Sequence, residues 1–415
     1  MGIKREAAVN RSIKYMTNIQ PPPDNVIEKE EKPLLSVVLP CLNEEEALPT
    51  CIEKIRAVFS RSNINGEIVV SDNGSTDDSV NIARRMGVQL VQQPLRGYGN
   101  AYKMGFTHAR GKYFIMADAD DTYDFNLIPL FLDKLVNEKC EFVTGSRYTG
   151  GGGHEIKFLH RYVGNPMLTL LLNVLFGTTY TDVYCGFRGF SREAYERIAP
   201  VSPGMEFNLE LAINAHLAKL KSAEIPITLA PRIGESKLST FKDGWRSLRM
   251  MLLYCPNKVF LVPGSLLFLC GVLLQTIVIF KLLNFHGEAL GIVTSLTGAM
   301  LCVIGFQIMS LGLHAKTYSW SRRFDVDNRV LLSFYSIFNL ELGMLVGIFM
   351  LLSGMLLWSY LIACWIWSDL RPLAHPEYAA FAATLTILGC NVIFTSLFIS
   401  AMSITKTEDH SLPIR

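Results

Sequence analysis

Long runs of apolar residues fill the C-terminal part of this 415-residue chain, and they constrain its architecture more than any other feature. Four runs, at 259–280, 289–313, 342–367 and 378–403, each have at least the roughly 20 residues that a helix needs to cross a bilayer. A core helix of a soluble protein usually shows one polar face, and these runs show none. The sequence therefore predicts an integral membrane protein with four transmembrane helices.

Basic residues are unevenly distributed around these spans. Lysines and arginines are clustered before the first span and between the second and the third, whereas the two other connections carry only Lys281 and Arg371. Loops rich in lysine and arginine stay in the cytoplasm. The polar N-terminal part and the C-terminus are therefore predicted to be cytoplasmic, in a bacterial or archaeal plasma membrane or in the endoplasmic reticulum of a eukaryote. A formal net charge of only +2 excludes a broad basic surface for nucleic acid.

Strand and helix patterns alternate along the polar part of the chain, from 34 to 145. Short apolar runs typical of buried strands are separated by segments with helical spacing, and they lie at 35–39, 67–71, 88–92, 113–117 and 142–144. This alternation predicts an α/β domain with a mainly parallel, Rossmann-like sheet and helices on both faces. The predicted organisation is a flexible tail (1–33), the α/β domain (34–240), an interfacial helix (241–258), the transmembrane domain (259–403) and a cytoplasmic tail (404–415).

Two further segments are apolar or amphipathic but too short to cross a bilayer. Residues 166–176 (PMLTLLLNVLF) are almost entirely apolar, and residues 241–254 (FKDGWRSLRMMLLY) place Arg246 and Arg249 beside Trp245. Basic and aromatic residues in one amphipathic helix are typical of the membrane interface. A soluble amphipathic helix has a similar pattern, and both interpretations stay open.

Polar segments follow three of the predicted strands. They are residues 40–44 (PCLNE), 72–77 (DNGSTD) and 118–121 (DADD), and each alone could be an ordinary turn or a helix cap. The carboxyl ends of parallel strands meet at one edge of a sheet, where ligands bind. Asp118 and Asp120 together suit a hard divalent cation that keeps open positions for phosphate oxygens. Asp72 suits hydrogen bonds from a nucleoside.

Together these three segments resemble the donor site of inverting family 2 glycosyltransferases with the GT-A fold. The resemblance narrows further along the chain, at residues 96–101 (RGYGNA), 145–148 (GSRY) with the glycines 150–153, Arg161, Asp182 with Gly186-Phe187, and 232–238 (RIGESKL). These segments are similar to those of polyprenyl-phosphate glycosyltransferases, such as dolichyl-phosphate mannosyltransferase and the undecaprenyl-phosphate glucosyltransferases. The resemblance covers about 34–250.

This resemblance implies a reaction. The enzyme would move one sugar from a UDP- or GDP-linked donor to a polyprenyl phosphate, with inversion, and so supply a lipid-linked sugar for glycan or cell-envelope assembly. It also implies Mg²⁺ or Mn²⁺ held by Asp118 and Asp120. One departure concerns the metal: Thr122 stands where the mannosyltransferases tend to have glutamine, which leaves Asp121 and Asp124 open as a third ligand.

The resemblance further implies a role for each matching residue. The donor would be bound by Pro40, Asn43, Glu44, Asp72, Gly97 and Asn100. Catalysis is expected to rest on Asp118, Asp120 and three arginines. The three arginines, which would face the phosphates of donor and acceptor, are Arg147, Arg161 and Arg232. Ser236 and Lys237 would support the loop that binds the acceptor phosphate.

Two other functions fit part of this sequence. A processive polysaccharide synthase also joins such a domain to membrane helices, but its Gln-x-x-Arg-Trp motif does not occur in the chain, and residues 244–246 (GWR) have the wrong order. A catalytically silent membrane partner of glycan assembly would not need the paired aspartates. Glu206 and Glu210 lie at helical spacing and are expected to start a helix or shape the site. The sequence leaves a homo-oligomer open.

Overall fold

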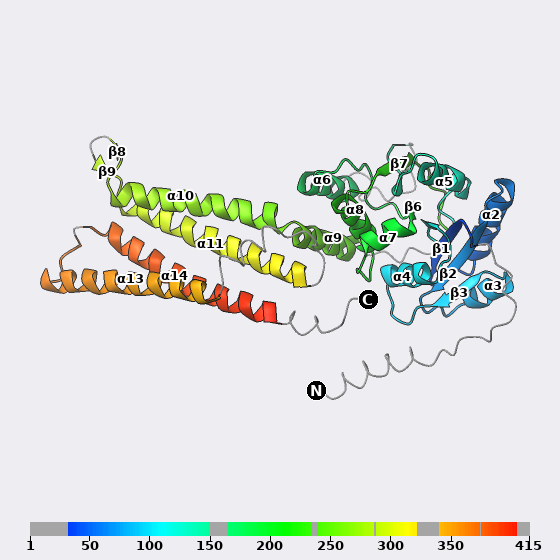
Figure 1. Ribbon diagram of the computed structural model, residues 1–415. Helices are drawn as coiled ribbons and strands as arrows, with labels where there is room; N and C mark the ends of the chain where they lie inside the picture. Colours follow the sequence, from blue (N-terminus) through cyan, green and yellow to red (C-terminus); the bar gives the residue numbers. More distant parts are fainter. Residues whose placement is uncertain are drawn as a thin grey trace, which may run out of the picture.

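The computed structural model describes residues 32–149, 164–233, 240–285, 288–321, 340–373 and 375–404. An α/β domain lies at one end, and four long helices lie side by side at the other (Figure 1). Most of the two expected tails, 1–31 and 405–415, lies outside the described residues, and so do three predicted site residues: Arg161, Ser236 and Lys237.

The α/β domain is built on a seven-stranded sheet with the order β3-β2-β1-β4-β6-β5-β7. β1 runs parallel to β2 and β4, β2 to β3, and β5 to β7, whereas β6 runs antiparallel to both of its neighbours. The mainly parallel sheet predicted from the sequence is therefore confirmed. The strands are β1 (Leu35–Cys41), β2 (Gly66–Asp72), β3 (Gln89–Gln92), β4 (Tyr113–Met116), β5 (Phe142–Ser146), β6 (Arg188–Ser191) and β7 (Ser222–Pro226).

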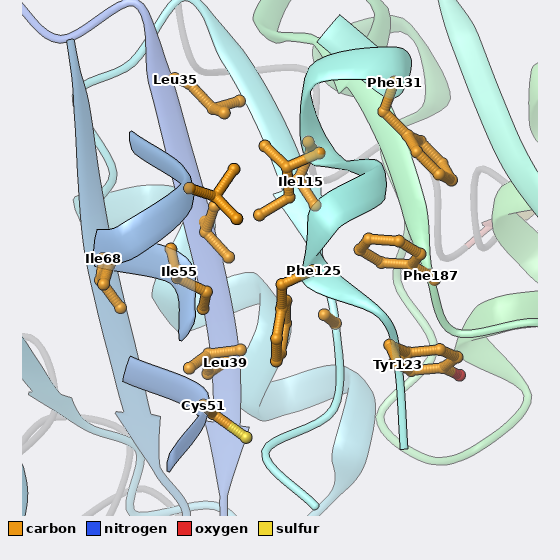
Figure 2. Close-up of a cluster of buried hydrophobic side chains, with 14 of the residues drawn as sticks. Leu35, Leu39, Cys51, Ile55, Ile68, Ile115, Tyr123, Phe125, Phe131 and Phe187 are labelled. Atoms are coloured by element: carbon orange, nitrogen blue, oxygen red, sulfur yellow. The ribbon is translucent and has the colours of Figure 1, made fainter. Parts of the chain in front are cut away.

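Helices cover both faces of this sheet because alternate residues of its central strands point to opposite sides. Leu35, Val37 and Leu39 of β1 belong to one apolar cluster, which α2 and α5 complete (Figure 2). Val38 belongs to a second cluster on the other face. The helices of this domain are α2 (Leu48–Arg61), α3 (Ser79–Arg85), α4 (Tyr98–His108), η1 (Phe125–Leu127), α5 (Ile128–Val136), α6 (Asn165–Phe176), α7 (Arg192–Ile198) and α8 (Phe207–Leu217).

A membrane-proximal helix, α9 (Thr240–Tyr254), connects the α/β domain to the bundle (Figure 1). Its Met250, Met251 and Tyr254 are buried in the second apolar cluster, while Trp245 is 58% exposed. The packed face fixes α9 to the domain, and the exposed aromatic side chain is available to a bilayer surface. Both short segments expected at the interface are thus helices, and their contact with lipid stays a prediction.

The bundle begins at η4 (Asn257–Leu261), directly after α9. Its long helices are α10 (Val262–Ile279), α11 (Ile292–Ser321), α13 (Leu340–Trp367) and α14 (Glu377–Ile404), with the strands β8 (Asn284–Phe285) and β9 (Glu288–Ala289) between the first two. Within the part of the chain that the structure describes, four helices can cross a membrane by length and composition: Asn257–Ile279, Ile292–Thr317, Leu340–Trp367 and Glu377–Met402. The four predicted spans are therefore present as helices.

Candidate active site

A cavity of about 400 Å³ opens where the sheet meets α9. It contains six of the residues predicted for the site: Pro40, Glu44, Gly97, Asp118, Asp120 and Arg232. The remaining lining comes from the strand ends and the loops after them, from the start of α4, from the loop before α8 and from α9: Cys41, Leu42, Asn73, Arg96, Tyr98, Ala101, Ala119, Gly204, Met205 and Arg246. The strand ends that are far apart in the sequence thus meet in one place, as expected for an α/β sheet.

Two of the predicted donor residues shape the loops instead of lining this cavity. The Asp72 carboxylate accepts hydrogen bonds from the backbone N–H groups of Gly74 (3.2 Å) and Ser75 (3.1 Å) in its own turn. Asn43 has a left-handed backbone (φ 52°), and its side-chain oxygen accepts a 2.7 Å hydrogen bond from the N–H of Thr76. Asp72 thus fixes the second loop, and Asn43 joins the first loop to it. Their contact with a nucleotide stays a prediction.

Asn73 holds the loop between β3 and α4. The sequence alone marked this residue only as part of a turn. Its amide nitrogen donates to the carbonyls of Gln93 (3.1 Å) and Leu95 (2.9 Å), and its oxygen accepts from the N–H of Gly97 (2.7 Å). Gly97 has a φ of 141°, and a Cβ there would overlap the carbonyl oxygen of Pro203. The predicted Asn100 donates its backbone N–H to that same carbonyl at 3.2 Å. This loop is therefore fixed on the cavity wall.

Three tyrosines surround the Asp118 carboxylate. The hydroxyls of Tyr98 (2.9 Å) and Tyr102 (3.3 Å) donate to one oxygen, and the hydroxyl of Tyr123 donates to the other at 3.3 Å. Burial, reinforced by the nearby charge of Asp120, raises the pKa of Asp118 to about 6. The tyrosines orient the carboxylate, and no pattern in the sequence marked them for this role.

Asp120 lies between a threonine and an arginine. One of its oxygens accepts a 2.7 Å hydrogen bond from the hydroxyl of Thr122, and the other lies 3.2 Å from the guanidinium of Arg232. The same guanidinium lies 3.3 Å from the carboxylate of Glu44. Arg232 therefore connects the first and fourth strand-end loops across the cavity.

The carboxylates of Asp118 and Asp120 fit a divalent cation, since both line the cavity and both present hard oxygen donors. Neither open alternative for a third ligand lines it. Asp121 forms a 2.7 Å ion pair with Lys54, and Asp124 caps η1 by accepting the N–H of Asn126. Within the described residues, no three His, Cys, Asp or Glu side chains converge on one point. Such an ion would keep positions for phosphate oxygens, as expected.

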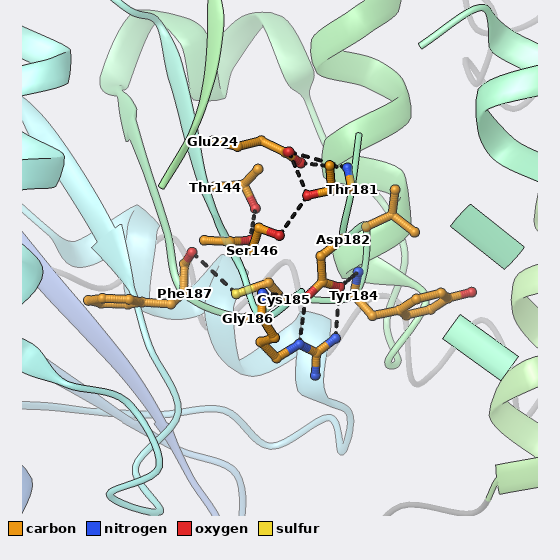
Figure 3. Close-up of polar contacts among 12 residues, drawn as sticks. Thr144, Ser146, Thr181, Asp182, Tyr184, Cys185, Gly186, Phe187 and Glu224 are labelled. Atoms are coloured by element: carbon orange, nitrogen blue, oxygen red, sulfur yellow. Dashed lines mark hydrogen bonds and ion pairs between the residues drawn. The ribbon is translucent and has the colours of Figure 1, made fainter. Parts of the chain in front are cut away.

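The structure places Arg147 differently from the expectation that it faces the phosphates. Its guanidinium forms a bidentate pair with the carboxylate of the fully buried Asp182, at 2.6 and 2.8 Å. Figure 3 labels Asp182 among the polar residues that surround it. Arg147 does not line the cavity. Burial opposes the ionisation of Asp182, but Arg147 outweighs it and lowers the pKa of that carboxyl. Arg147 therefore joins the end of β5 to the loop before β6. A contact with the acceptor phosphate stays a prediction.

The expected site-shaping role of Glu210 agrees with its contacts. This fully buried carboxylate accepts hydrogen bonds from the N–H groups of Val201 (2.9 Å) and Ser202 (2.7 Å), and from the hydroxyl of Tyr254 (3.0 Å). Tyr254 is the last residue of α9. Glu210 thus connects α9 to the loop that contributes Gly204 and Met205 to the cavity.

The fold and the site define an α/β domain with paired carboxylates at its strand ends, joined to long apolar helices that can cross a membrane. Residues 36–199 match the protein family described as Glycosyl transferase family 2. Residues 313–403 match the family described as Glycosyltransferase family 2 C-terminal transmembrane region. The low-salt glycan biosynthesis hexosyltransferase Agl6 of Haloferax volcanii is 35% identical over 371 residues, which are 89% of each chain. The chain belongs to glycosyltransferase family 2. It is a membrane glycosyltransferase, and the predicted GT-A fold and inverting family are confirmed.

Two further similarities are more limited. The dolichyl-phosphate hexose transferase of Haloferax volcanii is 32% identical over 210 residues, which are 51% of this chain and 89% of that protein. A crystal structure of glucosyl-3-phosphoglycerate synthase from Mycobacterium tuberculosis, in complex with Mn²⁺, UDP and glucosyl-3-phosphoglycerate, is 22% identical. Its alignment covers 57% of this chain and 86% of that chain, with a TM-score of 0.44.

Proposed function

We propose that this membrane glycosyltransferase moves one hexose from a nucleotide sugar to a polyprenyl phosphate at the cytoplasmic face of the membrane. The observation that carries the proposal is the cavity itself, which combines the paired carboxylates of Asp118 and Asp120 with Arg232 and is joined to the first span through α9. The similarity to a protein named dolichyl-phosphate hexose transferase supports the acceptor class. The lipid-linked sugar would serve glycan or cell-envelope assembly.

The proposed reaction is a direct displacement. An oxygen of the acceptor phosphate forms a bond to C1 of the sugar while the bond from C1 to the donor diphosphate breaks, so the anomeric configuration inverts. Asp118 and Asp120 would hold Mg²⁺ or Mn²⁺, which when bound offsets charge on the diphosphate. The acceptor is already an anion at neutral pH and needs no strong general base. It needs cations to offset repulsion between two phosphate groups, and arginine is suited to this.

Several finer assignments belong to the same proposal. The cluster of basic residues before the first span supports a cytoplasmic catalytic domain through the positive-inside rule. Arg161, Ser236 and Lys237 lie outside the described residues, and their roles at the acceptor phosphate stay predictions. The choice between UDP and GDP, the choice between Mg²⁺ and Mn²⁺, and a homo-oligomer also stay predictions.

The test is a transfer assay in membranes with polyprenyl phosphate and a panel of labelled UDP- and GDP-sugars. We expect one donor to label the lipid and the product to carry a single hexose with an inverted anomeric centre. A ladder of masses one hexose apart would instead identify a processive synthase. No labelled product with any donor would favour the non-catalytic partner.

A pair of neighbouring aspartates provides the matched variants. Asp120→Asn removes a cavity carboxylate, and we expect it to lower transfer about a thousandfold because several kcal/mol of charge stabilisation are lost. Asp121→Asn changes a carboxylate paired with Lys54 outside the cavity. Its left-handed backbone (φ 59°) suits asparagine, and we expect its activity to stay within about fivefold of the wild type. Equal loss in both variants would contradict the role of the cavity pair.

A further inference from the structure

We propose that Arg246 of α9 binds the phosphate of the lipid acceptor, an inference that rests on the proposed function. Arg246 lines the same cavity as Asp118, Asp120 and Arg232. Among the lining residues that the structure describes, it alone comes from the helix that precedes the first membrane span. The reaction cavity therefore has one wall that is part of the connection to the membrane.

The position of Arg246 is fixed from two sides. Toward the α/β domain, Met251 of α9 is fully buried, and the hydroxyl of Tyr254 donates to the buried Glu210 at 3.0 Å. Toward the membrane, Asn257 lies one turn beyond Tyr254, and its side-chain oxygen accepts a 3.1 Å hydrogen bond from Lys316 of α11. Arg246 therefore lies on the helix that leads directly from the cavity to the first span.

The charges in the cavity explain why the acceptor needs this residue. Among the described residues, the lining contains three carboxylates, of Glu44, Asp118 and Asp120, and three guanidinium groups. Arg232 is engaged by both Glu44 and Asp120. Arg147 is paired with Asp182 and does not line the cavity. Two anionic substrates meet in this space, so each additional cation in the lining lowers their repulsion.

The two remaining arginines of the lining lie on different elements. Arg96 belongs to the loop before α4, and its Nε would lie 3.9 Å from a Cβ added at Gly74, in the second strand-end loop. It therefore belongs to the wall formed by the sheet, where the donor is expected. Arg246 belongs to the wall formed by α9. A phosphate that arrives on a membrane-embedded chain approaches from this second wall, and a guanidinium can bind it through two parallel hydrogen bonds.

Three variants test this assignment in the full-length protein. Arg246→Gln removes the charge, Arg246→Lys keeps the charge but not the forked geometry, and Arg249→Gln removes an exposed arginine of the same helix that does not line the cavity. For each variant, the apparent KM is measured with undecaprenyl phosphate and with the nucleotide sugar that the wild type uses. The thermal unfolding midpoint of each purified protein verifies that it is folded.

We expect Arg246→Gln to raise the KM for undecaprenyl phosphate about tenfold or more, with the KM for the donor within twofold of the wild-type value. Arg246→Lys should restore only part of this loss, because the positive charge returns without the forked geometry. Arg249→Gln should match the wild type. The inference is overturned if Arg246→Gln matches Arg249→Gln, or if both KM values rise equally. A wild-type protein that labels no lipid phosphate with any donor overturns the proposed function and this inference together.

Discussion

The α/β domain and the membrane bundle bury different kinds of groups. The domain buries charged side chains next to its apolar clusters, and these side chains have specific partners. Asp182 forms an ion pair with Arg147. Glu210 accepts hydrogen bonds from two backbone N–H groups and from the hydroxyl of Tyr254. The bundle has buried polar contacts too, such as the 2.7 Å hydrogen bond from Gln275 to Thr384, but it also brings helix backbones together at glycines. A Cβ on Gly271 of α10 would lie 2.5 Å from the backbone nitrogen of Cys302 on α11. In the domain, ion pairs and hydrogen bonds of defined direction fix where the side chains lie. In the bundle, glycines determine how closely two helices approach each other.

Arg188 shows how far the domain depends on directional contacts. Its guanidinium is fully buried and donates to the carbonyls of Val183 (2.6 Å) and Cys185 (2.9 Å), and to the carbonyl of Asn208 in α8. The Asn208 side chain in turn donates to the hydroxyl of Tyr98 at 3.3 Å. The loop before β6, the start of α8 and the tyrosines around Asp118 therefore form one continuous network. A change at one of these points is expected to reach the cavity.

The largest effect on stability is expected from breaking the buried pair in this domain. Asp182→Asn leaves the charge of Arg147 without its carboxylate, in a site where the Asp182 side chain has no exposed area. Removing one partner of a buried ion pair typically costs about 3–5 kcal/mol. The matched control is Glu138→Gln, which breaks the exposed pair with Lys134 and should cost no more than about 0.5 kcal/mol. Chemical unfolding of the detergent-purified proteins measures both. Similar losses would show that the contrast between buried and exposed pairs does not hold.

The sequence predicted the features of this molecule that depend on local patterns. Hydrophobic periodicity identified the first five strands of the sheet and the four long helices, because burial on both faces or exposure to lipid leaves a continuous apolar signal. It did not predict β7, a parallel edge strand whose residues are mostly exposed or half-buried. Nor did it predict β6, a four-residue strand that contains a buried arginine and a glycine and runs antiparallel. A single charged residue in so short a segment resembles a loop.

The site was predictable to a similar degree. Paired carboxylates at strand ends indicated where a cation and a diphosphate would bind, since the edge of a parallel sheet gathers such residues. The tyrosines around Asp118 come from 20 residues before it to 5 residues after it, and their convergence depends on the packing of α4 against the sheet. The pairing of Asp121 with Lys54 and of Arg147 with Asp182 also depends on tertiary structure. Residue type alone could not separate a ligand-binding charge from an internally paired one.

A glycine in the bundle is expected to give an intermediate effect. A Cβ on Gly305 of α11 would overlap the backbone nitrogen of Phe268 and lie 2.8 Å from the carbonyl oxygen of Gly264, both on α10. Backbone atoms cannot rotate away, so Gly305→Ala should separate the helices and cost about 2 kcal/mol. Gly291→Ala is the control, because its Cβ would meet no atom within 4 Å. Thermal unfolding should distinguish the two variants. Equal midpoints would mean that close helix contact does not hold the bundle together.

The smallest expected effect concerns Asp118 and pH. Burial raises its pKa from an ordinary 3.8 to about 6, so a proton competes with a metal ion for this carboxylate at mildly acid pH. Below pH 6 the carboxyl is increasingly protonated and metal affinity should fall. Above pH 6 it is ionised and affinity should level off. The apparent affinity for Mn²⁺ should therefore be about tenfold weaker at pH 5 than at pH 7.

Electron paramagnetic resonance of free Mn²⁺ measures this affinity. Because lipid and nucleotide are left out, the titration of substrate phosphates cannot contribute to the result. Asp118→Asn should bind Mn²⁺ more weakly and lose the transition near pH 6. A wild-type transition near pH 4 would show that the tyrosine-lined carboxylate ionises as easily as an exposed one, and would remove this difference between the buried polar interior of the domain and ordinary protein surface.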